Sequence, residues 1–152
     1  MLPSFETVVA ADICRGAMRL LLAHDLTSLA EVTLPNGRRA DLMAVSASGE
    51  LTIVEIKSSR EDFLTDRKWG DYLPFCDRFL FAVAPGFPLD LLPESEGLIL
   101  ADRFSGEIIR PPQRRPLESA RRRSLLLRFA RLGALRLQGL ADPEAVAGRI
   151  LA

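Results

Sequence analysis

The sequence is poor in the residues on which several common kinds of site depend. It has one histidine, His24, so a histidine-based catalytic centre or zinc site is not expected. Its two cysteines, Cys14 and Cys76, are too few for a disulfide scaffold and lack metal-ligand spacing. The N-terminal residues also lack the basic-then-apolar pattern of a secretory signal. We therefore expect reduced thiols and a cytoplasmic location.

Long apolar runs are missing as well. No stretch approaches the ~20 apolar residues that span a bilayer, so no membrane partner is expected. A chain of 152 residues with 48% hydrophobic and 26% charged residues is ordinary for a globular protein. Neither an internal repeat nor a linker interrupts the sequence. We predict a single domain over residues 1–152.

The chain has no net charge, but its charges are segregated. Residues 1–109 hold 10 Lys/Arg and 17 Asp/Glu, a balance of −7, whereas residues 110–152 hold 10 and 3, a balance of +7. This asymmetry predicts an acidic body with a basic C-terminal helical segment that faces a polyanion. A charge run can also be only a solvated face. The arginines of this segment are Arg110, Arg114, Arg115, Arg121, Arg122, Arg123, Arg128, Arg131 and Arg136.

The hydrophobic periodicity and the turn residues predict an α+β fold with one central sheet of about five strands and helices on its faces. Strands are expected at 28–34, 38–47 and 50–58 as an antiparallel meander, then at 77–85, 97–102 and 106–112. Helices are expected at 4–24 with Ser4 as N-cap, at 59–75 with Ser59 as N-cap, at 117–133 ending at Gly133, and from Pro143 onward.

Two charged residues, Glu55 and Lys57, lie near the end of the strand expected at 50–58. The strand period of two places Glu55 and Lys57 on one face. Both faces of this strand carry apolar residues, so we expect the strand to be covered on both sides. An unpaired ion in such a place is costly, and some group should compensate these charges.

The preceding strand supplies a candidate partner for Glu55. If the hairpin loop is the three residues 47–49, with its glycine in the left-handed conformation, Ser46 pairs with Glu50. That register places Asp41 directly opposite Glu55, at a Cβ separation of about 4.5–5.5 Å. A two-residue loop would shift the register by one. Two carboxylates this close repel, and one takes up a proton unless a cation lies between them.

A hard divalent ion would relieve this repulsion. Mg²⁺, or Mn²⁺ in its place, is typically bound by one or two carboxylates together with phosphate and water oxygens. Such an ion polarises a phosphodiester and lowers the pKa of bound water. Lys57 can orient that water or stabilise developing negative charge. Asp41, Glu55 and Lys57 thus form a self-consistent metal-dependent phosphodiesterase site that needs no histidine.

Asp41, thirteen further residues and then Glu55-Ile56-Lys57 resemble the PD-(D/E)XK nuclease superfamily, although Ala40 stands where the motif usually has proline. The longer combination "RRAD…EIKSS…DF…D.KW..Y..FCD" is similar to the MmcB family of bacterial DNA repair proteins. The resemblance covers most of the chain. It implies a restriction-endonuclease-like α/β/α sandwich with a mixed central sheet.

The resemblance also implies roles for individual residues. Asp41 and Glu55 would ligate the metal, Ile56 would add its backbone carbonyl, and Lys57 would be the catalytic lysine. A glutamate on the first helix completes the site in many superfamily members, and Glu6 is the position to test. The dipole of the helix alone also explains an acid in its first turn.

Contacts with DNA are expected near this site and on the basic segment. Asp62 and Asp66, spaced i, i+4, need a cation, which Arg38 or Arg39 can supply; Lys68 can instead touch a phosphate. Trp69 and Tyr72 fit the core better than a base-stacking surface, and Glu31 fits the surface better than the site. The residues predicted to bind DNA are Arg38, Arg39, Ser58, Lys68, Arg121, Arg122 and Arg128.

The resulting hypothesis is a Mg²⁺- or Mn²⁺-dependent deoxyribonuclease that acts in DNA repair, with DNA as partner and no small-molecule cofactor. Two alternatives remain open. One is a non-catalytic DNA-binding repair module that keeps the nuclease fold, and the other is a protein-interaction module whose arginine helix docks on an acidic partner. Many such nucleases form homodimers to cut two strands, but the sequence identifies no interface.

Overall fold

The computed structural model describes residues 5–149 and 152, with side chains described for residues 10–149 and 152. The predicted Ser4 cap therefore lies outside the described residues. The elements are α1 (Phe5–Ala23), β1 (Thr27–Thr33), β2 (Arg39–Val45), β3 (Leu51–Ile56), α2 (Arg60–Thr65), η1 (Trp69–Phe75), β4 (Arg78–Val83), η2 (Leu89–Leu91), β5 (Gly97–Ala101), β6 (Gly106–Arg110), α3 (Ser119–Ala141) and η3 (Pro143–Val146), where η marks a 3₁₀ turn.

The strands form one six-stranded sheet in the order β1-β2-β3-β4-β5-β6. The first three strands are an antiparallel meander, β3, β4 and β5 are parallel, and β5–β6 is an antiparallel hairpin. The α+β class, the meander and the closing hairpin are thus confirmed. The sheet is mixed, as expected, and its six strands match the six expected strand segments, one more than the stated total of about five.

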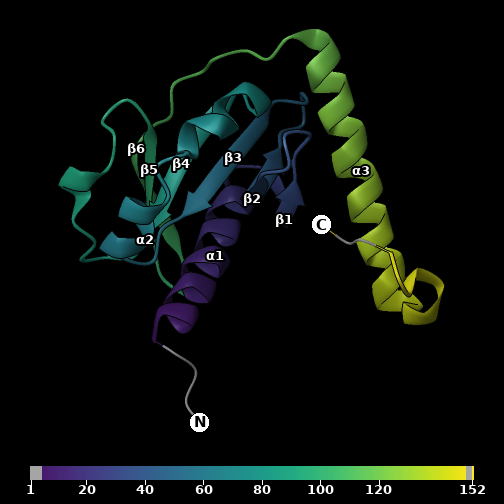
Figure 1. Ribbon diagram of the computed structural model, residues 1–152, viewed down its shortest axis with the longest axis horizontal. Helices are drawn as coiled ribbons and strands as arrows, with labels where there is room; N and C mark the ends of the chain where they lie inside the picture. Colours follow the sequence, from purple (N-terminus) through teal and green to yellow (C-terminus); the bar gives the residue numbers. More distant parts are fainter. Residues whose placement is uncertain (1–4, 150–151) are drawn as a thin grey trace.

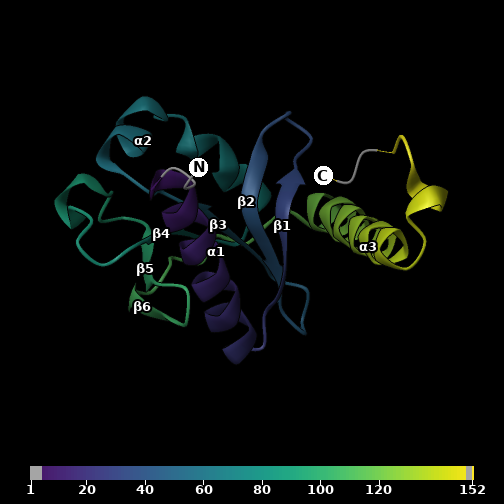
Figure 2. The same ribbon diagram turned by 90° about the horizontal axis from the view of Figure 1, so that it is seen from below.

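Both faces of the sheet are covered. On one face α1 packs through Ile13 and Ala17 against a cluster that includes Val54 of β3. On the other face η1 and α3 pack against a cluster that includes Ile53 of β3 and Phe81 of β4. Every residue of β3 from Leu51 to Glu55 is consequently buried, as the sequence pattern predicts. α3 lies beside β1, at the edge of the sheet (Figures 1 and 2).

The hairpin between β2 and β3 has the predicted three-residue loop. Gly49 has a φ of +87°, a left-handed conformation that glycine adopts without steric cost. Ser46 N–H donates to the Glu50 carbonyl at 3.0 Å, and Val45 pairs with Leu51. This loop sets the register of everything that follows along β3.

The predicted end of the C-terminal helix at Gly133 is wrong. α3 runs on to Ala141, and Gly133 lies within it without a left-handed φ, so it does not act as a helix C-cap. The helix ends before Pro143, which has no N–H for a further helical bond. Residues 143–146 form a 3₁₀ turn rather than the start of a new helix.

Asp77 fastens the C-terminal segment to the sheet. Its buried carboxylate accepts bonds from the backbone N–H of Leu51 at 2.8 Å and of Leu117 at 2.9 Å. It also accepts two bonds from the guanidinium of Arg122 on α3. Burial opposes ionisation of Asp77, but these bonds outweigh it, and its pKa lies below the ordinary value.

Candidate active site

Asp41 and Glu55 lie side by side where the β2–β3 ladder ends. The ladder runs to the pair Leu42 and Val54, and its next position places Asp41 opposite Glu55, as the hairpin predicts. Side chains form the bonds there: Asp41 N–H donates to Glu55 Oε1 at 2.9 Å, and Ile56 N–H donates to Asp41 Oδ2 at 2.7 Å. The backbone of each strand therefore holds the carboxyl group of the other.

Burial and mutual repulsion oppose ionisation of both carboxyl groups. Burial raises the pKa of Glu55, and the charge of Asp41 raises it further, to about 8. Burial also raises the pKa of Asp41, although the Ile56 N–H and the charge of Lys57 oppose the rise. The raised pKa of Glu55 favours its protonated form beside the Asp41 carboxylate. A second positive charge at this point would displace that proton.

Lys57 is buried and held by an acid that follows it in the chain. Its side chain is only 3% exposed, and Nζ lies 2.9 Å from Asp66 Oδ2 and 4.0 Å from Asp62 Oδ1. Burial works against ionisation of Asp66, yet the hydrogen bond from Lys57 and further cationic and backbone contacts lower its pKa below the ordinary value. The ammonium group therefore has a fixed position at the end of β3.

The cap of α2 brings these acids into place. Ser59 Oγ accepts a bond from the N–H of Asp62 at 3.1 Å, as expected of an N-cap residue. The Asp62 carboxylate in turn accepts from the N–H of Ser58 at 3.1 Å. Only three residues thus separate the end of β3 from the start of α2, which turns back over the end of that strand.

Sequence reasoning missed the pairing of Lys57 with Asp66. It assigned the two acids of α2 to Arg38 or Arg39, and Arg38 does lie 3.9 Å from Asp66, at the limit of an ion pair. The better partner is the lysine two residues after Glu55. The sequence did contain a signal for this pairing: Asp62 and Asp66, spaced i, i+4, follow closely after Lys57 at the end of a strand. A helix that folds back over that strand end brings such acids to the lysine.

A cavity of about 510 Å³ opens beside the carboxyl pair. α1 contributes small side chains to its wall, which leaves room above the carboxyl groups. Glu31 borders the cavity with a φ of +53°, an uncommon conformation for a residue with a side chain. Its carboxylate is largely exposed, in agreement with the prediction of a surface residue. The lining residues are Ala10, Ala11, Cys14, Ala30, Glu31, Arg39, Asp41, Glu55, Ile56, Lys57, Asp62, Asp66 and Tyr72.

The donor set fits a hard divalent ion held by two carboxylates. Among the side chains described, no three His, Cys, Asp or Glu residues lie close enough together to hold a metal by themselves. Asp41 and Glu55 match the one or two carboxylates that Mg²⁺ typically takes, and their mutual repulsion is what such an ion relieves. Ile56 borders the cavity. The Glu6 side chain, the remaining predicted ligand, lies outside the described residues.

The predicted DNA-contacting residues near the cavity differ in their partners. Arg39 lines the cavity with an exposed side chain, 3.8 Å from Glu31. Arg38 is bound to Asp71 at 3.1 Å. Lys68 is exposed, whereas Ser58 is half-buried and tied to α2 through its backbone. Arg39 and Lys68 are therefore the two that present their charge to solvent.

The predicted arginines of α3 also divide into two kinds. Arg122 donates to the buried carboxylate of Asp77, which neutralises it within the fold. Arg121 lies over the Phe75 ring and donates to a backbone carbonyl, and Arg128 donates to the Thr33 carbonyl at 3.1 Å. The last two keep a net positive charge at the surface.

The aromatic residues near the site belong to the core, as predicted. Trp69 stacks on Phe79 with ring centroids 5.9 Å apart and meets Phe81 edge-on. Tyr72 is 4% exposed and donates its hydroxyl hydrogen to the Arg39 carbonyl. Cys76 is likewise a buried hydrophobe, 2% exposed, whose burial raises the pKa of its thiol to about 12.

The sequence pattern of the MmcB-like DNA repair proteins matches residues 5–144. The chain belongs to this family. The MmcB-like membership supports a role in DNA repair, in agreement with the sequence prediction. No curated protein sequence matches the chain.

A solved structure of a protein of unknown function from Silicibacter pomeroyi is similar to this MmcB-like chain. The two share 43% sequence identity, and the match covers 90% of this chain and 93% of the other with a TM-score of 0.87. The match therefore supports the six-stranded architecture over nearly all of the chain. Within the described residues, no helix combines the length and the apolar character needed to cross a membrane.

Proposed function

We propose that this MmcB-like protein is a Mg²⁺- or Mn²⁺-dependent deoxyribonuclease of the PD-(D/E)XK type that acts in DNA repair. One observation carries the proposal: the buried carboxyl group of Glu55 and the half-buried one of Asp41, with no arginine paired to either among the described residues, border a cavity beside the buried Lys57. Perturbed acids of this kind cluster at functional sites.

Asp41 and Glu55 would hold the ion, with the Ile56 carbonyl and Glu6 as further oxygen ligands. Bound there, the ion would polarise the phosphodiester and make water more acidic. The backbone N–H groups of Asp41 and Ile56 already hold one oxygen of each carboxylate. The other oxygen of each group would be available to a metal ion, whose charge would favour the ionised form of Glu55.

Lys57 would act on the phosphate. An ammonium group has three N–H donors, and Asp66 takes one of them at 2.9 Å. Another can donate to a phosphate oxygen as negative charge develops on it, or orient the attacking water. Hydrolysis adds a hydroxyl group to phosphorus and a proton to the departing sugar oxygen, and both come from one water molecule. Asp66 is a positioning residue in this scheme, because it fixes Nζ without touching the substrate.

The first test joins calorimetric Mn²⁺ binding to cleavage of single-stranded, nicked, flapped and four-way-junction DNA. The wild type is expected to bind Mn²⁺ and cut at least one substrate. Glu55→Gln should lose both activities. Lys57→Ala should keep Mn²⁺ binding and slow cleavage about 100-fold or more, as expected when a charge-stabilising donor is lost.

A matched control is Glu61→Gln, which removes an exposed acid of α2 that lies outside the cavity. It should bind Mn²⁺ and cut DNA like the wild type. If the wild type binds DNA but neither binds Mn²⁺ nor cuts any substrate, the nuclease proposal is wrong. The non-catalytic DNA-binding module then becomes the better account of the fold.

A further inference from the structure

α3 carries more positive charge than the fold uses. Its 23 residues contain six arginines and no acid, and Glu118 serves as its N-cap. On this helix, Arg122 is bound to the carboxylate of Asp77. Arg121 and Arg128 bind backbone carbonyls, which leave their charges uncompensated. A basic, acid-free helix of this kind attracts anions from solution.

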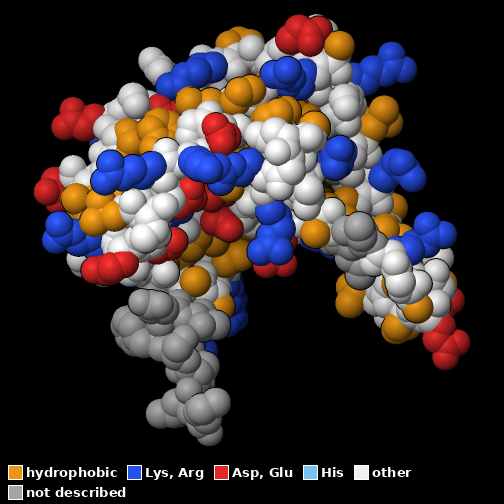
Figure 3. All heavy atoms as spheres, in the orientation of Figure 1, with side chains coloured by type: hydrophobic (Ala, Val, Ile, Leu, Met, Phe, Trp, Pro, Cys, Tyr) orange, Lys and Arg blue, Asp and Glu red, His pale blue; other side chains and the backbone are white. Residues whose placement is uncertain are grey.

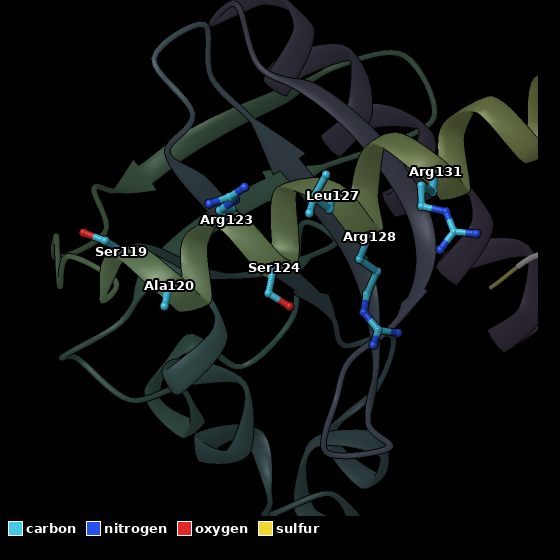
Figure 4. Close-up of a pocket in the computed structure, with 7 residues that line it drawn as sticks. All are labelled: Ser119, Ala120, Arg123, Ser124, Leu127, Arg128 and Arg131. Atoms are coloured by element: carbon cyan, nitrogen blue, oxygen red, sulfur yellow. The ribbon is translucent and has the colours of Figure 1, made fainter.

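The surplus charge faces outward along one side of the helix. Leu125 and Leu132 point into the core, whereas the opposite side presents arginine and serine side chains to solvent. Between them lies an open hollow of about 810 Å³, and Figure 4 shows its labelled side chains projecting from α3. From Arg123 to Arg131 the helix rises ~12 Å, which suits successive phosphates of a nucleic-acid strand. The hollow is lined by Ser119, Ala120, Arg123, Ser124, Leu127, Arg128 and Arg131.

A second groove, of about 700 Å³, runs between the β1–β2 turn and α2. Arg67 and Lys68 line it with exposed side chains. Asp66 also lines it, but its charge is taken up by Lys57 and, more distantly, by Arg38. The groove also offers the neutral polar residues Asn36 and Thr65, and its remaining lining residues are Gly37, Arg38 and Leu64.

The two grooves flank the same turn, and the second also adjoins the cavity of the carboxyl pair. Arg128 of the first groove donates to Thr33, at the end of β1 where the turn begins, and in Figure 4 its side chain extends toward that turn. Asn36 in the turn donates to the carbonyl of Asp71 in η1. Asp66 lines both the second groove and the cavity of the carboxyl pair. Figure 3 shows Lys and Arg side chains spread across this face from the α2 side to α3.

The chemistry of the grooves favours duplex DNA over single strands. Proteins that hold single-stranded nucleic acid stack its bases on exposed aromatic side chains. Neither groove is lined by an aromatic residue, and Tyr72, the aromatic residue that lines the cavity, is buried with its hydroxyl group bonded. Binding would therefore rest on phosphates, and a duplex presents twice the charge per unit length.

We propose that the two grooves bind the phosphate backbone of duplex DNA on either side of the β1–β2 turn and deliver it to the carboxyl pair. The proposal rests on the DNA-directed function proposed above and names its substrate class and binding path. Recognition is independent of base sequence, because the groups on the path contact phosphates and sugars.

The test is fluorescence anisotropy with a labelled 20-bp duplex, the matching single strand and an RNA duplex, all in EDTA so that metal chemistry plays no part. Arg123→Gln/Arg128→Gln/Arg131→Gln should weaken duplex binding about tenfold or more and lower the slope of log affinity against log salt by about 2–3. Arg67→Gln/Lys68→Gln should lower that slope by about 1–2.

The matched control is Arg15→Gln/Arg19→Gln/Arg103→Gln, which removes the same charge from residues that line neither groove. It should change duplex affinity by less than about twofold, and circular dichroism melts should show that all variants stay folded.

The groove proposal is overturned if the control weakens binding as much as the groove variants, if the groove variants bind like the wild type, if the single strand or RNA binds more tightly, or if the wild type binds no duplex. Failure of Mn²⁺ binding and cleavage with the groove effects intact would instead remove only the nuclease function.

Discussion

The pKa values of the buried carboxyl groups at the two ends of β3 are shifted in opposite directions. Beside its start, Asp77 receives two bonds from Arg122 and two from backbone N–H groups, and its pKa is lowered despite burial. At its other end Glu55 is just as buried but faces Asp41, and its pKa rises to about 8. Burial alone therefore does not decide how an acid ionises in this protein; the neighbouring charge does.

The contrast separates a structural acid from a candidate functional one. A fold selected only for stability would place an arginine beside Glu55, as it does beside Asp77. Instead the nearest buried cation, Lys57, is bound to Asp66. The repulsion between the two carboxyl groups is therefore not relieved by an arginine, and the pair borders a cavity. This is the arrangement that a metal-dependent site requires.

The largest expected change in stability comes from the end of β3 where Asp77 is fully hydrogen-bonded. Asp77→Ala should lower the free energy of unfolding by about 3–5 kcal/mol, because it leaves the Arg122 charge and two N–H groups without their acceptor. Urea unfolding followed by circular dichroism measures this loss. A loss below about 1 kcal/mol would show that the contact does not anchor α3.

At the other end of β3, where Asp41 and Glu55 repel each other, a divalent ion should stabilise the protein. Mn²⁺ at 100 times its dissociation constant should raise the free energy of unfolding by about 2.7 kcal/mol, because it binds the folded chain alone. Urea unfolding with and without Mn²⁺ measures the gain, and Asp41→Asn should abolish it. Equal stabilisation of Asp41→Asn would place the ion elsewhere.

The pH dependence of stability should expose the raised pKa of Glu55. Between the ordinary value of 4.5 and about 8, the folded chain keeps a proton that the unfolded chain releases. Stability from this group is therefore complete below pH 4.5 and falls as pH rises toward 8. Glu55→Gln should remove this fall and be more stable than the wild type by several kcal/mol at pH 9. Parallel curves for wild type and variant in urea unfolding would contradict this assignment.

The smallest effect should come from an acid that has arginines but little burial. Glu50 pairs with Arg114 at 2.6 Å and with Arg78 at 3.3 Å, and a quarter of its side chain is exposed. Glu50→Gln should cost only about 0.5–1 kcal/mol in urea unfolding, because solvent screens such pairs. A cost near that of Asp77→Ala would mean that pairing matters more than burial.

The pairing of Asp41 with Glu55 was predictable because it depends only on the length of a hairpin loop and on the two-residue period of a strand. A three-residue loop ending in Gly49 sets the register, and a period of two along each strand then places Asp41 and Glu55 on one face. The α+β class follows from the same periodicities. Neither step requires knowledge of how distant segments pack.

The remaining contacts depend on tertiary packing, which a single sequence does not specify. Arg122 and Asp77 are 45 residues apart, and nothing in the chain distinguishes this arginine from its neighbours on α3. Lys57 meets Asp66 only because α2 folds back over β3. Gly133 is typical of a helix end, but it lies within α3, which continues to Ala141.

β1 is the first strand of the sheet, so its outer edge carries backbone acceptors that another strand can pair with. Guanidinium groups of α3 occupy these acceptors: Arg136 donates to Ala30 and Glu31, and Arg128 to Thr33. A strand from a second molecule would have to displace them to extend the sheet. The helix thus guards the protein against edge-to-edge aggregation, and a chain shortened before α3 should lose solubility together with its positive charge.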